Sequence, residues 1–184
     1  RSPDLLQDIM LFDERQYPKD YFDFVWASPD CRAYSVARPS HARIPREEAM
    51  EASDPLLKKT RQIIAYFDKA KWCIENPGFS YIWQREVAAG LLENSVITSY
   101  CSFEGYAYRK HTRLASNFPL VLPKCPGKGL CPKMIGGKHK EHAQRGGGGQ
   151  EPKSHNLDKL HSIPEGLVHE IFKQLNVGSS AVQD

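Results

Sequence analysis

The sequence contains no apolar run that approaches the roughly 18 residues of a membrane-spanning helix, so it predicts no membrane span. Cysteine is scarce, and its odd count of five has no regular spacing. This favours an intracellular reducing compartment, whether cytoplasm, nucleus or organelle, over a secreted disulfide scaffold. Internal repeats are also missing. Because the first residue is arginine and not methionine, we expect a processed product or a fragment.

A strong net charge is likewise absent. The formal charge of +3 and the sequence pI of about 8.6 favour an anionic partner only mildly and name none. What is present is ordinary globular composition, with 40% hydrophobic and 26% charged residues. A chain of 184 residues can form one domain with a sizeable core.

Two short apolar runs end in polar segments that could carry chemistry. Residues 23–27 lead into Ser28-Pro29-Asp30-Cys31, and residues 71–74 lead into Glu75-Asn76-Pro77. Runs of this length and composition predict buried parallel strands. Asp54-Pro55 is a typical helix start, and apolar residues then recur at helical spacing to Phe67, which predicts a βαβ unit. A thiol and a carboxylate would then meet at the carboxyl ends of two strands, where α/β sheets bind ligands.

The rest of the chain predicts three further parts. Residues 81–92 suit a helix broken near Gly90, and residues 96–103 and 114–118 suit two strands. A core of strands and helices would therefore cover 1–118, followed by a Pro/Gly/Lys-rich loop or linker over 119–153. Residues 154–184 would hold a C-terminal helix, over 164–175, and a frayed tail.

Four motifs in this order resemble the cytosine-5 DNA methyltransferase family, especially its compact phage and virus types. They are Asp8-Ile9, Ser28-Pro29-Asp30-Cys31, Ile74-Glu75-Asn76-Pro77 and Tyr108-Arg109-Lys110-His111-Thr112-Arg113. The resemblance implies an α/β, Rossmann-like S-adenosylmethionine-dependent fold with a mostly parallel sheet. It also implies that the first strand and its Gly-rich turn are missing from this chain.

The same resemblance implies the roles of the site residues. Cys31 would add to carbon 6 of cytosine, Glu75 would hydrogen-bond ring nitrogen 3, and Arg113 would hold the base carbonyl. The cofactor would be S-adenosylmethionine, and its site would include Asp8, Ile9 and Pro29. The substrate site would include Asn76, Arg109 and His111. DNA is the favoured partner, and its target base would be flipped out of the duplex.

Departures from the family pattern keep two alternatives open. Asp30 replaces the proline that normally precedes the nucleophile, and its carboxylate should oppose a Cys31 thiolate. His111 stands where the first arginine of the pair is usual. A degenerate fold, kept as a structural or binding subunit of a larger assembly, is one alternative. The other is an RNA cytosine methyltransferase, because the same motifs serve RNA in some relatives.

A second cluster, Cys125, Cys131, His139 and His142, has weak metal-ligand character. Its spacing is loose for a zinc knuckle, and the segment is rich in proline, glycine and lysine. A basic surface loop with incidental cysteines explains this pattern better than zinc, so no metal is predicted.

Overall fold

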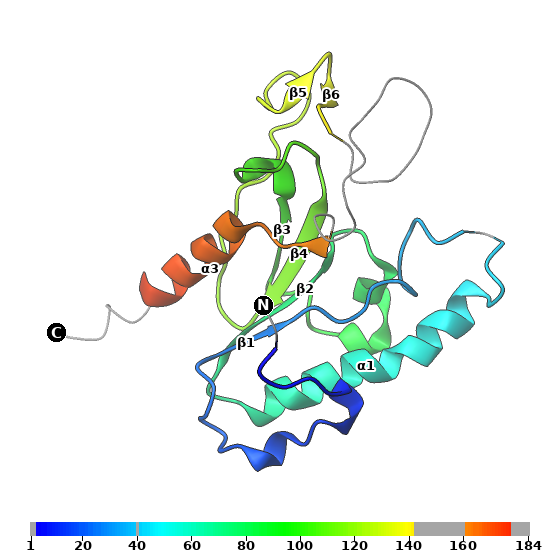
Figure 1. The fold of residues 1–184 in the computed structure, drawn as a ribbon, viewed down its shortest axis with the longest axis vertical. Coiled ribbons are helices and arrows are strands. Elements are labelled where there is room, and N and C mark those ends of the chain that lie inside the picture. Colours follow the sequence, from blue (N-terminus) through cyan, green and yellow to red (C-terminus); the bar gives the residue numbers. More distant parts are fainter. Residues whose placement is uncertain (1–2, 40, 142–160, 178–184) are drawn as a thin grey trace. The chain divides into compact units, whose positions relative to one another are not determined.

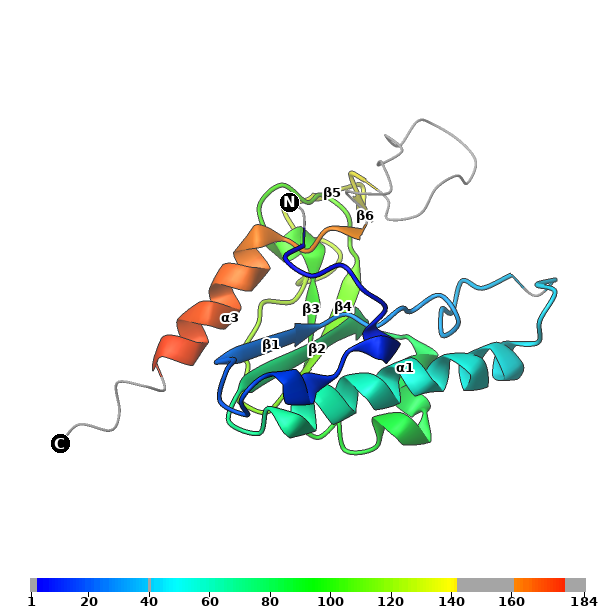
Figure 2. The same ribbon diagram turned by 60° about the horizontal axis from the view of Figure 1, so that its bottom comes forward.

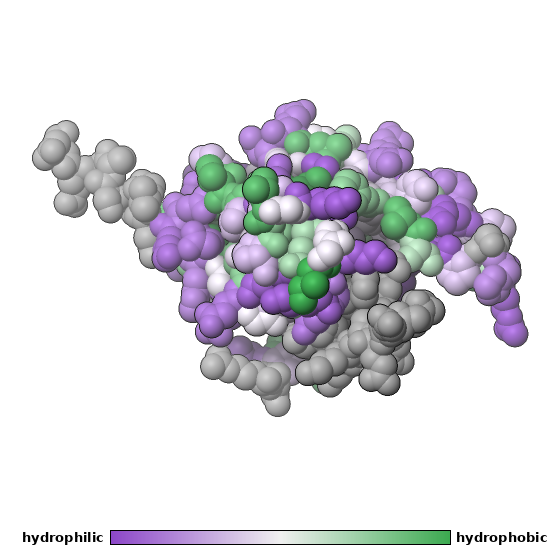
Figure 3. All heavy atoms as spheres, turned by 90° about the horizontal axis from the view of Figure 1, so that it is seen from above, coloured by the Kyte–Doolittle hydropathy of each residue, from purple (hydrophilic) through white to green (hydrophobic). Residues whose placement is uncertain are grey.

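The computed structural model describes residues 3–39, 41–141 and 161–177. Within these ranges no helix is both long and apolar enough to cross a membrane. On the face shown in Figure 3, hydrophobic and hydrophilic residues are interspersed.

The predicted βαβ unit is present. Strand β1 (Phe24–Ala27) pairs in parallel with β2 (Lys71–Pro77), in a register that sets Ala27 opposite Ile74. Helix α1 (Arg46–Tyr66) connects them, and Figure 1 shows the arrangement. The full sheet has the order β1-β2-β4-β3, where β3 is Ser95–Ser99 and β4 is His111–Ser116. The α/β class and its parallel pair agree with the expected Rossmann-like methyltransferase architecture.

Helix α1 covers one face of β1 and β2, as the two ribbon views show (Figures 1 and 2). Its apolar side packs into the main core, where Leu57 and Ile64 are buried with Ile74 of β2 and with Val25 of β1 partly buried against them. Burial of this apolar face, at about 25 cal/mol per Å², is what holds the helix on the sheet. The packing of α1 on the sheet therefore holds the carboxyl ends of β1 and β2 in place.

The predicted start of α1 at Asp54-Pro55 is wrong. The helix begins at Arg46, and Pro55 lies inside it. Tertiary contacts explain the earlier start: Arg85 bonds both Asp54 carboxylate oxygens at 2.7–3.1 Å and also pairs with Glu47. These ion pairs hold the first half of the helix in place despite the backbone hydrogen bond that proline cannot donate.

The helix predicted over residues 81–92 is also wrong. The structure has two short 3-10 helices, η3 (Tyr81–Gln84) and η4 (Glu86–Ala88), followed by turns. Ser80 caps η3, since its hydroxyl accepts from the Ile82 backbone N–H at 3.3 Å. The chain bends repeatedly here, and Ile82, Trp83, Ala88 and Leu91 are all buried in the core as a result.

The chain divides into two compact units. The first comprises residues 1–95 with 114–119, and includes η1 (Ile9–Leu11) and η2 (Glu14–Gln16). The second comprises residues 96–113 with the described residues from 120 onward. It holds η5 (Tyr100–Ser102), the antiparallel pair of β5 (Met134–Ile135) and β6 (Lys138–His139), and α3 (Glu165–Val177).

Helix α3 confirms the predicted C-terminal helix. Leu167 and Ile171, one turn apart, are fully buried. Gln174 fastens the helix to the segment after β4, because its amide accepts from the Val121 N–H at 2.8 Å and donates to the Val121 carbonyl at 2.9 Å.

Candidate functional site

The carboxyl ends of β1 and β2 bring the first two candidate segments together. Because the strands are parallel and Ala27 pairs with Ile74, the Ser28–Cys31 segment leaves β1 at the edge of the sheet where Glu75 and Asn76 extend β2 to its end at Pro77. Asn76 Nδ2 donates to the Pro29 carbonyl oxygen at 2.8 Å, which ties the two segments directly. Glu75 is buried, at 8% exposure, whereas Cys31 is partly exposed. The thiol is thus accessible to a reagent while the carboxylate is sheltered.

The chain after Cys31 is held by main-chain bonds. The Tyr34 N–H donates to the Cys31 carbonyl at 3.1 Å, which closes a turn. The Tyr34 carbonyl then accepts from the Tyr81 N–H at 3.0 Å. The Tyr34 hydroxyl donates to Asp54 at 3.0 Å, and burial raises its pKa well above the ordinary value. Cys31 therefore sits in a loop anchored on both sides.

Asp30, which precedes the thiol, is engaged by the residue that follows it. Its carboxylate accepts from the Arg32 Nε at 2.7 Å and from the Arg32 backbone N–H at 2.9 Å. The Arg32 guanidinium lowers the pKa of the Asp30 carboxyl group, so this carboxylate is charged and paired. The charge expected to oppose a Cys31 thiolate is consequently balanced within the same turn.

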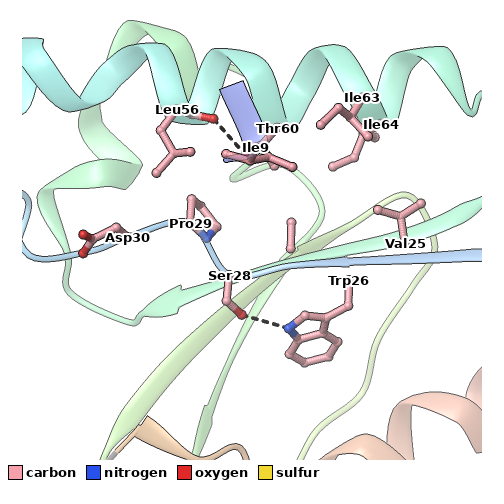
Figure 4. Close-up of a pocket in the computed structure, with 11 residues that line it drawn as sticks. Ile9, Val25, Trp26, Ser28, Pro29, Asp30, Leu56, Thr60, Ile63 and Ile64 are labelled. Carbon is pink, nitrogen blue, oxygen red and sulfur yellow. Dashed lines mark hydrogen bonds between the residues drawn. The ribbon is translucent and has the colours of Figure 1, made fainter. Parts of the chain in front are cut away.

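A cavity of about 400 Å³ lies between α1 and the segment that leaves β1 (Figure 4). Its lining is largely apolar and includes two predicted cofactor residues, Ile9 and Pro29, with Leu56 and Ile63 of α1. The third predicted cofactor residue, Asp8, does not line it. The Asp8 carboxylate instead accepts from the Met10 N–H at 2.9 Å and caps η1.

The basic candidates lie on and before β4. His111 and Arg113 alternate with the buried Thr112, so their side chains share one face of the strand. His111 Nδ1 is 3.1 Å from the Ser99 hydroxyl. Burial, helped by the nearby charges of Arg109 and His139, lowers the pKa of His111. Burial likewise lowers the pKa of Arg113. His111 and Arg109 belong to the second unit, as does Arg113, whereas Cys31 and Glu75 belong to the first.

The cysteine and histidine candidates of the second unit do come together. Cys125, Cys131 and His139 meet Cys101, which follows β3, and the four potential ligand atoms lie within 4.8 Å of one another. Sequence spacing gave no signal for Cys101, because it is separated from the other three by β4. His142 lies outside the described residues.

The thiols of this cluster have perturbed pKa values. Burial, reinforced by hydrogen bonds with Cys125 and Cys131, raises the pKa of Cys101 to about 12. For Cys125, burial acts upward, but the Gly127 backbone N–H and the neighbouring thiols outweigh it and lower the pKa. Cys73, inside β2, is a separate buried thiol whose pKa desolvation raises to about 12.

The chain thus has an α/β fold with a partly exposed thiol and a buried carboxylate near the carboxyl ends of two parallel strands. No family model matches the chain. It is 28% identical over 181 residues to a protein of Frog virus 3 (isolate Goorha) described as a probable DNA (cytosine-5)-methyltransferase. The match covers 86% of this chain and 80% of the viral protein. The resemblance predicted from the four motifs is therefore confirmed.

Among solved structures, the chain is similar to the methyltransferase EhMeth of Entamoeba histolytica. The TM-score is 0.40 at 17% identity, over 65% of this chain and 41% of that one.

Proposed function

We propose that this chain is a DNA cytosine-5 methyltransferase domain in which the Cys31 thiol is the nucleophile. The similarity to the viral protein supports the substrate class. The observation that carries the proposal is the hydrogen bond from Asn76 Nδ2 to the Pro29 carbonyl, which ties the thiol-bearing loop to the segment holding Glu75.

The chemistry divides a difficult substitution into easier steps. The Cys31 thiolate adds to carbon 6 of a flipped cytosine, forming a carbon–sulfur bond and raising the electron density at carbon 5. The Glu75 carboxyl group hydrogen-bonds ring nitrogen 3, where negative charge develops. Carbon 5 then takes the methyl group, its proton leaves, and elimination of the Cys31 thiolate restores the aromatic ring.

S-adenosylmethionine, when bound, would supply the electrophilic methyl group. The cavity beside β1 fits such a ligand in two respects: its volume of about 400 Å³ is in the range of ligand pockets, and its apolar walls suit an adenine ring. Ile9 and Pro29 would line this site. The Asp8 carboxylate caps η1 in this structure. To contact the cofactor, it would turn from this position toward the cavity.

A mechanism-based trap tests the proposal. Incubation with S-adenosylmethionine and duplex DNA carrying 5-fluorocytosine should give a covalent complex that survives denaturation, because fluorine at carbon 5 cannot leave as a proton does. Mass spectrometry should place the DNA adduct on Cys31. Cys31→Ser should abolish it, and Cys73→Ala, which alters a buried thiol away from the loop, should retain it.

Two outcomes would reject the proposal. Absence of an adduct while calorimetry shows S-adenosylmethionine binding would leave a binding or structural role. An adduct with fluorocytosine RNA but not with the matching DNA would assign the domain to RNA.

A further inference from the structure

We propose that Cys101, Cys125, Cys131 and His139 bind one zinc ion through three thiolate sulfurs and an imidazole nitrogen. This site lies wholly within the second unit and does not depend on methyl transfer. It departs from the expectation that zinc is absent, which was based on three of these residues without Cys101.

The distances match a tetrahedral site. Cys125 Sγ and Cys131 Sγ lie 3.4 and 3.5 Å from His139 Nε2. A tetrahedral zinc ion, with bonds of about 2.3 Å to sulfur and about 2.0–2.1 Å to nitrogen, separates such ligands by roughly 3.6 Å. All four ligand atoms lie within 4.8 Å of one another, which is close enough for one ion to bind all four after small side-chain adjustments.

The turn after Cys125 has the form that supports a metal-bound sulfur. Gly127 has a φ of +89°, a conformation that favours glycine, and its N–H donates to the Cys125 sulfur. The Cys131 N–H then donates to the Gly127 carbonyl at 3.1 Å, and the Met134 N–H donates to the Cys131 carbonyl at 3.1 Å. Backbone donors of this kind orient the side chains that bind a metal and offset thiolate charge.

The protein environment indicates a closed, structural site. Cys101 and Cys131 are buried at 5% and 6% exposure, while Cys125 and His139 are partly buried. Four protein ligands leave no open coordination position, as in structural and not catalytic zinc sites. Three sulfurs and one imidazole nitrogen in a tetrahedron favour zinc over cations that prefer oxygen.

The described residues 117–141 have little regular secondary structure. They contain two strands of two residues each, β5 and β6. A metal ion here would join the turn after β3 to residues 125–131 and to β6, which lie beyond β4 in the sequence. The free energy of metal binding would then contribute directly to folding of this unit, and the three thiols would release their protons on binding.

Metal analysis of the full chain tests the proposal. Protein purified under reducing conditions, incubated with zinc chloride and desalted should hold about one zinc ion per chain by inductively coupled plasma mass spectrometry. Cys125→Ser and His139→Ala should each weaken zinc binding by at least about tenfold in a chelator competition assay. Cys31→Ser and Cys73→Ala are matched controls, because both remove a thiol outside the cluster and should retain the metal.

A measurement on the wild-type chain tests the proposal even if the variants fail to fold. Replacement of zinc by Co²⁺ in the wild-type chain should give the intense visible bands of tetrahedral cobalt with thiolate-to-metal charge transfer. A folded wild-type chain that holds far less than one zinc ion would overturn the proposal, as would an octahedral cobalt spectrum. A Cys125–Cys131 disulfide that persists in reducing buffer would overturn it as well.

Discussion

At the scale of single residues, the tripeptide around the candidate nucleophile resolves an apparent conflict in the sequence. Asp30 suggested a carboxylate that would oppose a thiolate, but its two hydrogen bonds from Arg32 balance that charge locally. The sequence contains the arginine, but only the geometry shows that the aspartate turns toward it. A departure from a family pattern can therefore be compensated two residues away.

The buried carboxylate of Glu14 predicts how the stability of the protein depends on pH. Its carboxylate, 4% exposed, accepts from Lys59 Nζ at 2.8 Å and from Gln62 Nε2 at 2.6 Å. The Lys59 bond lowers the pKa of Glu14, so its contribution to stability is fully present above the ordinary glutamate pKa and is lost as pH falls through the lowered value. Glu14→Gln should cost about 3 kcal/mol at pH 7, and the difference from wild type should shrink toward pH 3.

Urea unfolding followed by tryptophan fluorescence measures this effect, because Trp26, Trp72 and Trp83 all lie in the first unit. The control is Asp13→Asn, at the position next to Glu14, which removes an exposed ion pair with Arg15. This variant should change stability much less. An equal loss in both variants, or a Glu14→Gln effect that is the same at every pH, would contradict the assignment.

At the scale of elements, the paired ends of β1 and β2 determine what the candidate site can do. Asn76→Ala removes the hydrogen bond to the Pro29 carbonyl that positions the Cys31 loop. We expect a loss of about 1–2 kcal/mol in stability and a larger loss, at least about tenfold, in the rate of adduct formation at Cys31.

Asn117→Ala provides the matched control for that variant. Asn117 bonds the Ala70 carbonyl and the Trp72 N–H, both at 2.9 Å, at the opposite end of β2. It should lose comparable stability but leave adduct formation close to wild type. If both variants trap DNA at the same rate, Asn76 has no positioning role.

Sequence patterns predicted these elements unevenly. The strands β1 and β2, the crossover helix and α3 follow from apolar periodicity, and all are confirmed. The start of α1 was misplaced because Asp54-Pro55 is a strong local helix start, whereas the ion pairs of Arg85 that extend the helix to Arg46 come from 31 and 38 residues away. Residues 81–92 were misassigned because burial of their apolar side chains is reached by successive bends and not by one helical face.

The candidate site shows the same division. Cys31 and Glu75 were predicted at one sheet edge from their place after two strands, and the pairing of those strands puts their segments there. Cys101 was not found, because only the fold brings it to cysteines that lie beyond another strand. Contacts between distant segments are what single-sequence patterns cannot supply.

At the scale of the whole molecule, the division into two units predicts a local response to metal loss. If zinc joins Cys101, Cys125, Cys131 and His139, a chelator should reduce hydrogen-exchange protection over residues 99–139 outside β4. The amides of β1 and β2 should stay protected, and tryptophan fluorescence should not change. Equal loss of protection in both units would show that the metal supports the entire fold and not one unit.

The distribution of sulfur has a practical consequence. Cys73 is buried, and the thiols of Cys101, Cys125 and Cys131 lie close together. In a metal-loaded chain, Cys31 would therefore be the one readily modified thiol among the five. An oligonucleotide bearing an activated disulfide could then be cross-linked at a single defined atom, giving a homogeneous complex for crystallisation.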